Sequence, residues 1–135
     1  MKKPIKPCRD VLFVLANIGE GAHGNGLLTR IAEGVIVKGQ ILKKGTADTQ
    51  VKPCAALTDV GLYVALDAAA DGEVIPVSVL GNLTGTVLAT ASGAVAVGDL
   101  ISPLGTAVAN GLTCGRALTA AADGADFEMA HKVCT

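Results

Sequence analysis

The segment of this chain best suited to binding chemistry is a glycine-rich loop. Gly19-Glu20-Gly21-Ala22-His23-Gly24 follows an apolar stretch, Val11 to Ile18, and matches the glycine pattern of dinucleotide-binding loops. In that fold a helix begins at the loop and holds a pyrophosphate at its N-terminus, but here Gly34 and Gly39 interrupt the helix early. The position of the ribose-binding acid holds Lys43-Lys44, and no alternation of strands and helices follows. The sequence therefore favours a flexible loop over a nucleotide site.

The histidines and the paired aspartates also lack a catalytic pattern. His131 lies on the same face of an expected strand as Phe127, which indicates a packed side chain. His23 lies among glycines. Asp71 and Asp123 could form a carboxylate pair, but each precedes a glycine, and Asp-Gly is typical of turns. No nucleophile elbow and no zinc-protease motif is present. We therefore predict that the protein is not an enzyme and has no catalytic residue and no cofactor.

The cysteines do not follow the spacing of a metal site or of a disulfide framework. They stand at positions 8, 54, 114 and 134, without a Cys-x-x-Cys pair and without a cluster of cysteines and histidines. We predict that they are reduced, mostly buried small side chains, and that no metal is bound.

Composition excludes several classes of function. The chain has 135 residues, of which 50% are hydrophobic and only 2% aromatic, and its net charge is −1. Nucleic-acid binding is not expected, because it usually requires a basic excess. No apolar run is long enough to span a membrane, and the Val11–Ala16 stretch is short for an export signal, so we expect neither membrane anchoring nor export. The 17 glycines and five prolines favour short strands joined by turns.

An internal repeat organises most of the chain. Residues 65–72 read ALDAAADG and residues 117–124 read ALTAAADG, and a strand-like alternation of apolar and polar residues follows each copy. Upstream, residues 33–42 and 92–101 share the order of a glycine, an apolar alternation, a second glycine, a polar residue and two aliphatics. These matches define two units, about 33–80 and 92–134, of which the second has the shorter interior loop.

The repeat predicts an all-β fold, a small β-barrel or β-sandwich with internally duplicated β units. We expect the Ala-rich stretches to be loops or single turns. Residues 1–32 are predicted to be an N-terminal arm with the Gly-rich loop, and residues 33–135 a single β domain. The predicted structural turns contain Asp71, Gly72, Gly98, Asp123 and Gly124.

The arm carries a cluster of basic residues beside two prolines, and its extended backbone admits two interpretations. It is either a frayed terminus or a segment that becomes ordered on a negatively charged partner surface. In the second case the contact residues would be Lys2, Lys3, Lys6 and Arg9.

Residues 90–129, which read TASGAVAVGDLISPLGTAVANGLTCGRALTAAADGADFEM, resemble the capsid cement (decoration) proteins of tailed bacteriophages and prophages. The resemblance rests on turn glycines and small apolar residues, namely Gly93, Gly98, Asp99, Gly105, Gly115, Ala117, Leu118, Asp123 and Gly124. It implies a non-enzymatic protein, made in the host cytoplasm, that becomes part of the virion. Such proteins bind the outer surface of the assembled icosahedral head, bridge subunits of the major capsid protein and often form trimers.

A different class, a small enzyme or carrier module, remains as the alternative. It would be either a dinucleotide-binding fragment or a lipoyl-like β domain. A lipoyl-like domain presents a lysine at a tight hairpin, and neither Asp-Gly turn carries one.

Overall fold

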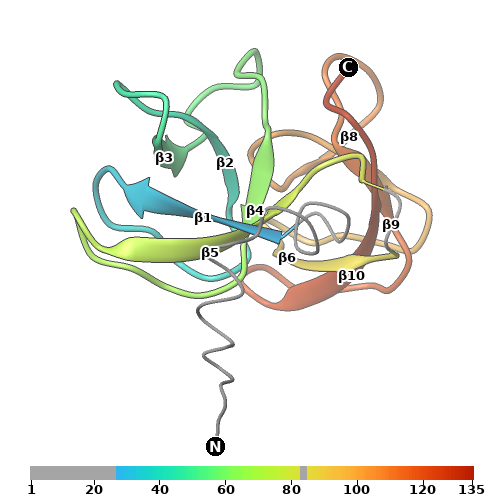
Figure 1. The fold of residues 1–135 in the computed structure, drawn as a ribbon. Helices are drawn as coiled ribbons and strands as arrows, with labels where there is room; N and C mark the ends of the chain where they lie inside the picture. The colour runs from blue at the N-terminus through green and yellow to red at the C-terminus, as the bar shows by residue number, and fades with distance from the viewer. Residues whose placement is uncertain (1–26, 83–84) are drawn as a thin grey trace, which may run out of the picture.

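The computed structural model describes residues 27–82 and 85–135, and these residues form ten β-strands and no helix (Figure 1). The prediction of an all-β fold is therefore confirmed. The strands are β1 (Leu27–Ala32), β2 (Ile41–Lys44), β3 (Gln50–Pro53), β4 (Tyr63–Ala65), β5 (Val74–Val79), β6 (Val87–Thr90), β7 (Leu100–Ile101), β8 (Ala107–Val108), β9 (Gly115–Ala117) and β10 (Asp126–His131).

The first five strands close into a barrel in the order β1-β3-β2-β4-β5. Neighbouring strands are antiparallel except for β1 and β3, which run parallel and pair Ile31 with Gln50 and Ala32 with Val51. That parallel contact, together with the pairing of β1 on β5, closes the barrel and leaves it without a free edge. Small aliphatic side chains fill its interior: Ala32, Ile36, Leu42, Val51, Ala65, Ala69, Ile75 and Val77.

The last five strands repeat this arrangement as an open sheet, in the order β6-β10-β9-β7-β8. If β6 to β10 are matched with β1 to β5, the order of strands is the same, and only the pair corresponding to β1–β3 is missing. The strand that would have to pair with β6, β8, is present but has only two residues. The isolated bridges Ile36–Ala69 and Val95–Ala121 occupy matching places, and the two partners lie 33 positions apart in the first bridge and 26 in the second. The second unit is thus shorter by 33 − 26 = 7 residues between these points, as the sequence indicated.

Hydrogen bonds repeat in the two units as closely as the strands do. The amide of Gly34 donates to the Oδ1 atom of Asp71 over 2.8 Å, and the amide of Gly93 donates to the Oδ1 atom of Asp123 over the same distance. The second residue of β5, Ile75, and the second residue of β10, Phe127, are both fully buried. Duplicated sequence has therefore produced duplicated structure.

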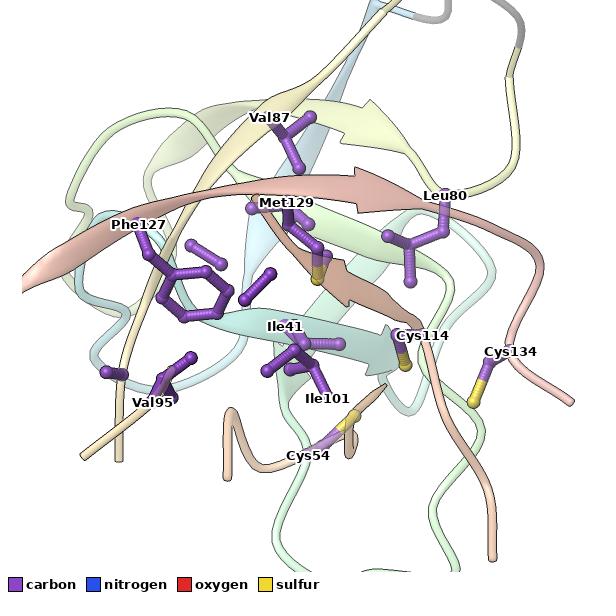
Figure 2. Close-up of a cluster of buried hydrophobic side chains, with 14 residues drawn as sticks. Ile41, Cys54, Leu80, Val87, Val95, Ile101, Cys114, Phe127, Met129 and Cys134 are labelled. Carbon is purple, nitrogen blue, oxygen red and sulfur yellow. The ribbon is translucent and has the colours of Figure 1, made fainter. Parts of the chain in front are cut away.

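A second hydrophobic core lies between the barrel and the open sheet (Figure 2). Strands β2 and β4 separate the two cores, because successive side chains of a strand point to opposite faces. Leu42 and Ala65 face the barrel interior, whereas Ile41 and Val64 face the second core. The outer wall of the barrel thus covers the sheet that the second unit leaves open.

Strand β1 changes one predicted boundary. The sequence pattern places residues 27–32 in the arm and loop, but they form a barrel strand, so the β domain begins at residue 27 rather than residue 33. The strand is held by partners far along the chain, mainly β5, and its own sequence shows no strict alternation. The Ala-rich stretches before Asp71 and Asp123 are loops, as predicted. The predicted arm and the Gly-rich segment up to residue 26 lie outside the described residues.

Candidate interaction surfaces

The two Asp-Gly turns serve as loop anchors in the structure. Each aspartate accepts a backbone amide from the loop that follows the first strand of its own unit. The glycines beside them, Gly72 and Gly124, have φ angles of 85° and 83°, which favour glycine. The carboxylates of Asp71 and Asp123 are thus each engaged within one unit, and the structure gives them a positional role.

Gly39 lies where the two units approach each other closely. Its φ angle is 87°, and its carbonyl accepts a hydrogen bond from the amide of Thr90 on β6 over 3.0 Å. The Oγ1 atom of Thr90 also donates to the carbonyl of Lys38 over 2.9 Å. The matching glycine of the second unit, Gly98, has a similar φ angle of 92° but faces open space. Equivalent turns therefore have different surroundings, and only the first forms part of the interface between the units.

His131 lies at the connection between the units. Its Nδ1 atom accepts a hydrogen bond from the amide of Gly81 over 2.9 Å, so this nitrogen carries no proton. Burial lowers the pKa of His131 below its ordinary value, against an opposing hydrogen bond with the backbone of Gly85. The side chain therefore holds both ends of the link between β5 and β6, in agreement with the packed histidine expected from the sequence.

Cys54, Cys114 and Cys134 are buried in the second core, as predicted, and Cys8 lies outside the described residues. Burial raises the pKa of Cys54 to about 12, and it raises that of Cys114 further. These thiols are poor nucleophiles in the folded protein, because the reactive form is the thiolate. Within residues 27–82 and 85–135, no group of cysteine, histidine and acidic side chains could hold a metal ion.

The β3–β4 loop, residues 54–62, exposes apolar side chains to solvent. Leu57 is 52% exposed, Val60 53% and Leu62 39%. The loop belongs to the part of the first unit that is longer than its counterpart. No sequence motif marks this loop, although its extra length and its three aliphatic residues are a usable signal.

Asp59 holds the β3–β4 loop in one conformation. Its Oδ2 atom accepts the Lys43 ammonium over 2.9 Å and the amides of Ala55 and Ala56 over 2.7 and 3.0 Å. These bonds, that of Lys43 first, lower the pKa of Asp59 to about 2. The carboxylate therefore keeps its charge at neutral pH and fixes the loop. A loop of this kind presents apolar area to a partner with little further loss of entropy.

A groove of about 430 Å³ forms a second candidate surface. Leu27, Lys38 and Leu66 line it from the first unit, and Thr86 and Leu88 line it from the second. Because both units contribute, the groove depends on how they pack together. Its exposed leucines, Leu27 and Leu88, add to the apolar area that the protein presents.

Comparison with known proteins identifies the fold. No protein-family profile matches the chain, and no curated protein matches it in sequence. Among solved structures, the head fiber gp8.5 N base of bacteriophage phi29 matches with a TM-score of 0.62 and 18% sequence identity, over 81% of this chain and 92% of that one. The two proteins share a fold. The part of the chain that the structure describes contains no helix able to cross a membrane.

Proposed function

We propose that this protein is a structural component of a bacteriophage head, and specifically a decoration protein that binds the outer surface of the assembled capsid. The observation that carries the proposal is the shared fold with a phage head-fiber base, which extends over most of both chains. The resemblance of residues 90–129 to capsid cement proteins points to the same class independently of the fold.

The surface of the protein suits attachment to a repeating lattice. With one tyrosine, two phenylalanines and no tryptophan, the chain lacks the large aromatic anchors that usually dominate a single tight interface. The exposed aliphatic residues of the β3–β4 loop provide modest contacts instead. On a capsid many copies bind at once, and linked weak contacts give strong overall attachment. We propose that the protein bridges neighbouring subunits of the major capsid protein and clusters as a trimer.

We further propose that the N-terminal arm contributes to binding through Lys2, Lys3, Lys6 and Arg9. All four lie outside the described residues, so their role rests on the sequence alone. Ordering an arm costs on the order of 1–2 kcal/mol per residue fixed. We therefore place the ordering on the capsid, where contacts with an acidic patch offset that cost.

A non-enzymatic role fits the state of the polar groups in the described residues. Asp71 and Asp123 each accept a backbone amide, Nδ1 of His131 is occupied, and the pKa values of Cys54 and Cys114 are raised. The alternative of a nucleotide-binding or lipoyl-like module receives no comparable support.

Capsid pelleting tests the proposal. Purified protein is mixed with mature capsids of the phage or prophage that encodes it, and the capsids are sedimented with and without an excess of unlabelled protein. We expect saturable co-sedimentation at a fixed ratio to the major capsid protein. Sedimentation that never saturates, or none at all, would contradict the proposal.

A further inference from the structure

The last residues of the chain run antiparallel to the segment that leads into β9. The amide of Thr113 donates to the carbonyl of Thr135 over 2.9 Å, and the amide of Thr135 donates back to the carbonyl of Thr113 over 3.2 Å. Such reciprocal bonds define a hydrogen-bonded pair, so the next residues inward, Cys114 and Cys134, face each other as a non-hydrogen-bonded pair. In these pairs the Cα atoms lie about 4.5 Å apart, within the range that a disulfide spans.

A bulge brings Cys134 into this position. Gly115 pairs with His131, so two residues, Lys132 and Val133, lie between that pair and the Cys114–Cys134 pair on one strand only. The amide of Lys132 donates to the carbonyl of Cys114 over 2.9 Å, and Val133 is 61% exposed. Without the two extra residues, Lys132 would face Cys114. The bulge therefore sets the register that places sulfur opposite sulfur.

Both sulfurs lie in the same core. Cys114 is 0% exposed and Cys134 is 7% exposed, and Figure 2 shows them at the same end of the second core. Burial raises the pKa of Cys114, and a hydrogen bond with the thiol of Cys134 raises it further. The two thiols are thus close neighbours in the reduced protein, and because the pairing of Thr113 with Thr135 makes their residues face each other, joining them requires little movement of the backbone.

We propose that Cys114 and Cys134 form an intramolecular disulfide when the protein meets a disulfide oxidant such as glutathione disulfide. The thiolate of Cys134 attacks one sulfur of the oxidant, which releases one glutathione thiolate and leaves a mixed disulfide. The thiolate of Cys114 is a minor form because its pKa is raised, but it faces the Cys134 sulfur, and this proximity allows it to attack that sulfur and release the second glutathione. The two protein thiols are oxidised, the oxidant is reduced to two glutathione molecules, and their protons pass to the released thiolates.

The segment that carries Cys134 gives the oxidant access. Residues 132–135 lie beyond β10, and Lys132, Val133 and Thr135 are exposed, so this segment opens more readily than the core does. Local opening of residues 132–135 would expose the Cys134 sulfur without unfolding either unit. Reclosure then returns the mixed disulfide to Cys114. The bond would form in an oxidising medium and would tie the end of the chain to β9.

Peptide mapping of the full-length protein tests this proposal independently of any capsid. The folded protein is incubated with glutathione disulfide, the remaining thiols are blocked, and digested peptides are examined by mass spectrometry. We expect a Cys114–Cys134 linkage in the wild type and in Cys54→Ser, and no intramolecular linkage in Cys134→Ser. Oxidised Cys54→Ser should also unfold at a higher urea concentration than its reduced form, because the bond restricts the unfolded chain.

Cys54 provides the critical control. It lies in the same core, and its thiol is close enough to Cys134 for their charges to interact. A Cys54–Cys134 linkage in the wild type would overturn the proposal, and so would a mixed disulfide that never resolves or a complete absence of reaction. Cys134→Ser replaces one sulfur by oxygen at a position outside the ten strands, so the variant is expected to fold, and circular dichroism checks this.

Discussion

Replacing Gly39 by alanine should destabilise the protein more than the same change at Gly98, its counterpart in the second unit. Both residues have positive φ angles, 87° and 92°, so an alanine at either position is strained by about 1–2 kcal/mol. At Gly98 a Cβ atom would meet nothing within 4 Å. At Gly39 it would lie 2.9 Å from the backbone nitrogen of Thr90 and would also contact the Thr90 hydroxyl.

The extra cost at Gly39 comes from the interface between the units. A backbone atom cannot rotate away as the end of a side chain can, so β6 must shift, and overpacking of this kind costs about 1–3 kcal/mol. The shift also strains the hydrogen bond from Thr90 to the Gly39 carbonyl. We therefore expect a loss of about 1–2 kcal/mol for Gly98→Ala and about 2–5 kcal/mol for Gly39→Ala.

Urea denaturation of the two variants measures this difference. The second core contains side chains of both units, so we expect a single unfolding transition. The dependence of the unfolding free energy on urea concentration should be unchanged in both variants. Equal losses in the two variants would refute the claim that Gly39 is an interface residue. A separate early transition in Gly39→Ala would refute the claim that the units unfold together.

Three further predictions concern pH and binding. The pKa of His131 is lowered in the folded protein, so its contribution to stability is complete above about pH 6.5 and is lost as pH falls toward the folded-state pKa. His131→Gln should therefore flatten this part of the plot of unfolding free energy against pH, measured by urea denaturation. Deleting residues 1–9 should leave the unfolding midpoint nearly unchanged but reduce capsid binding in pelleting assays, with the larger effect at low salt; equal binding at both salt concentrations would show that the arm makes no contact. Leu57→Ser with Val60→Ser should weaken pelleting at all salt concentrations while preserving the fold, because both side chains are exposed. Val74→Ser, at a still more exposed position on the barrel, is the control and should bind as the wild type does.

The fold class and the duplication could be predicted because their signals are local. The repeated Ala-rich stretches and the Asp-Gly turns encode loops that form in the same way twice, with Asp71 and Asp123 accepting equivalent amides. The alternation after each turn placed Ile75 and Phe127 at matching buried positions, since a period of two is the geometry of a half-buried strand.

The packing of the two units could not be predicted, because it depends on contacts between distant residues. Strand β1 is defined by pairing with β5 and β3, and neither partner is visible in its own residues. Ile41 and Leu42 are adjacent and both buried, which conceals the alternation, because β2 lies between two cores. The β3–β4 loop depends on Asp59 reaching Lys43, a contact across sixteen positions that no local pattern announces.

Electron cryomicroscopy of capsids incubated with the purified full-length protein tests the central claim most directly. The account predicts added density on the outer surface of the head where major capsid subunits meet. The β domain, with its barrel and open sheet, should fit that density at regularly repeated positions. Density confined to the interior of the head, or capsids indistinguishable from those without added protein, would contradict it.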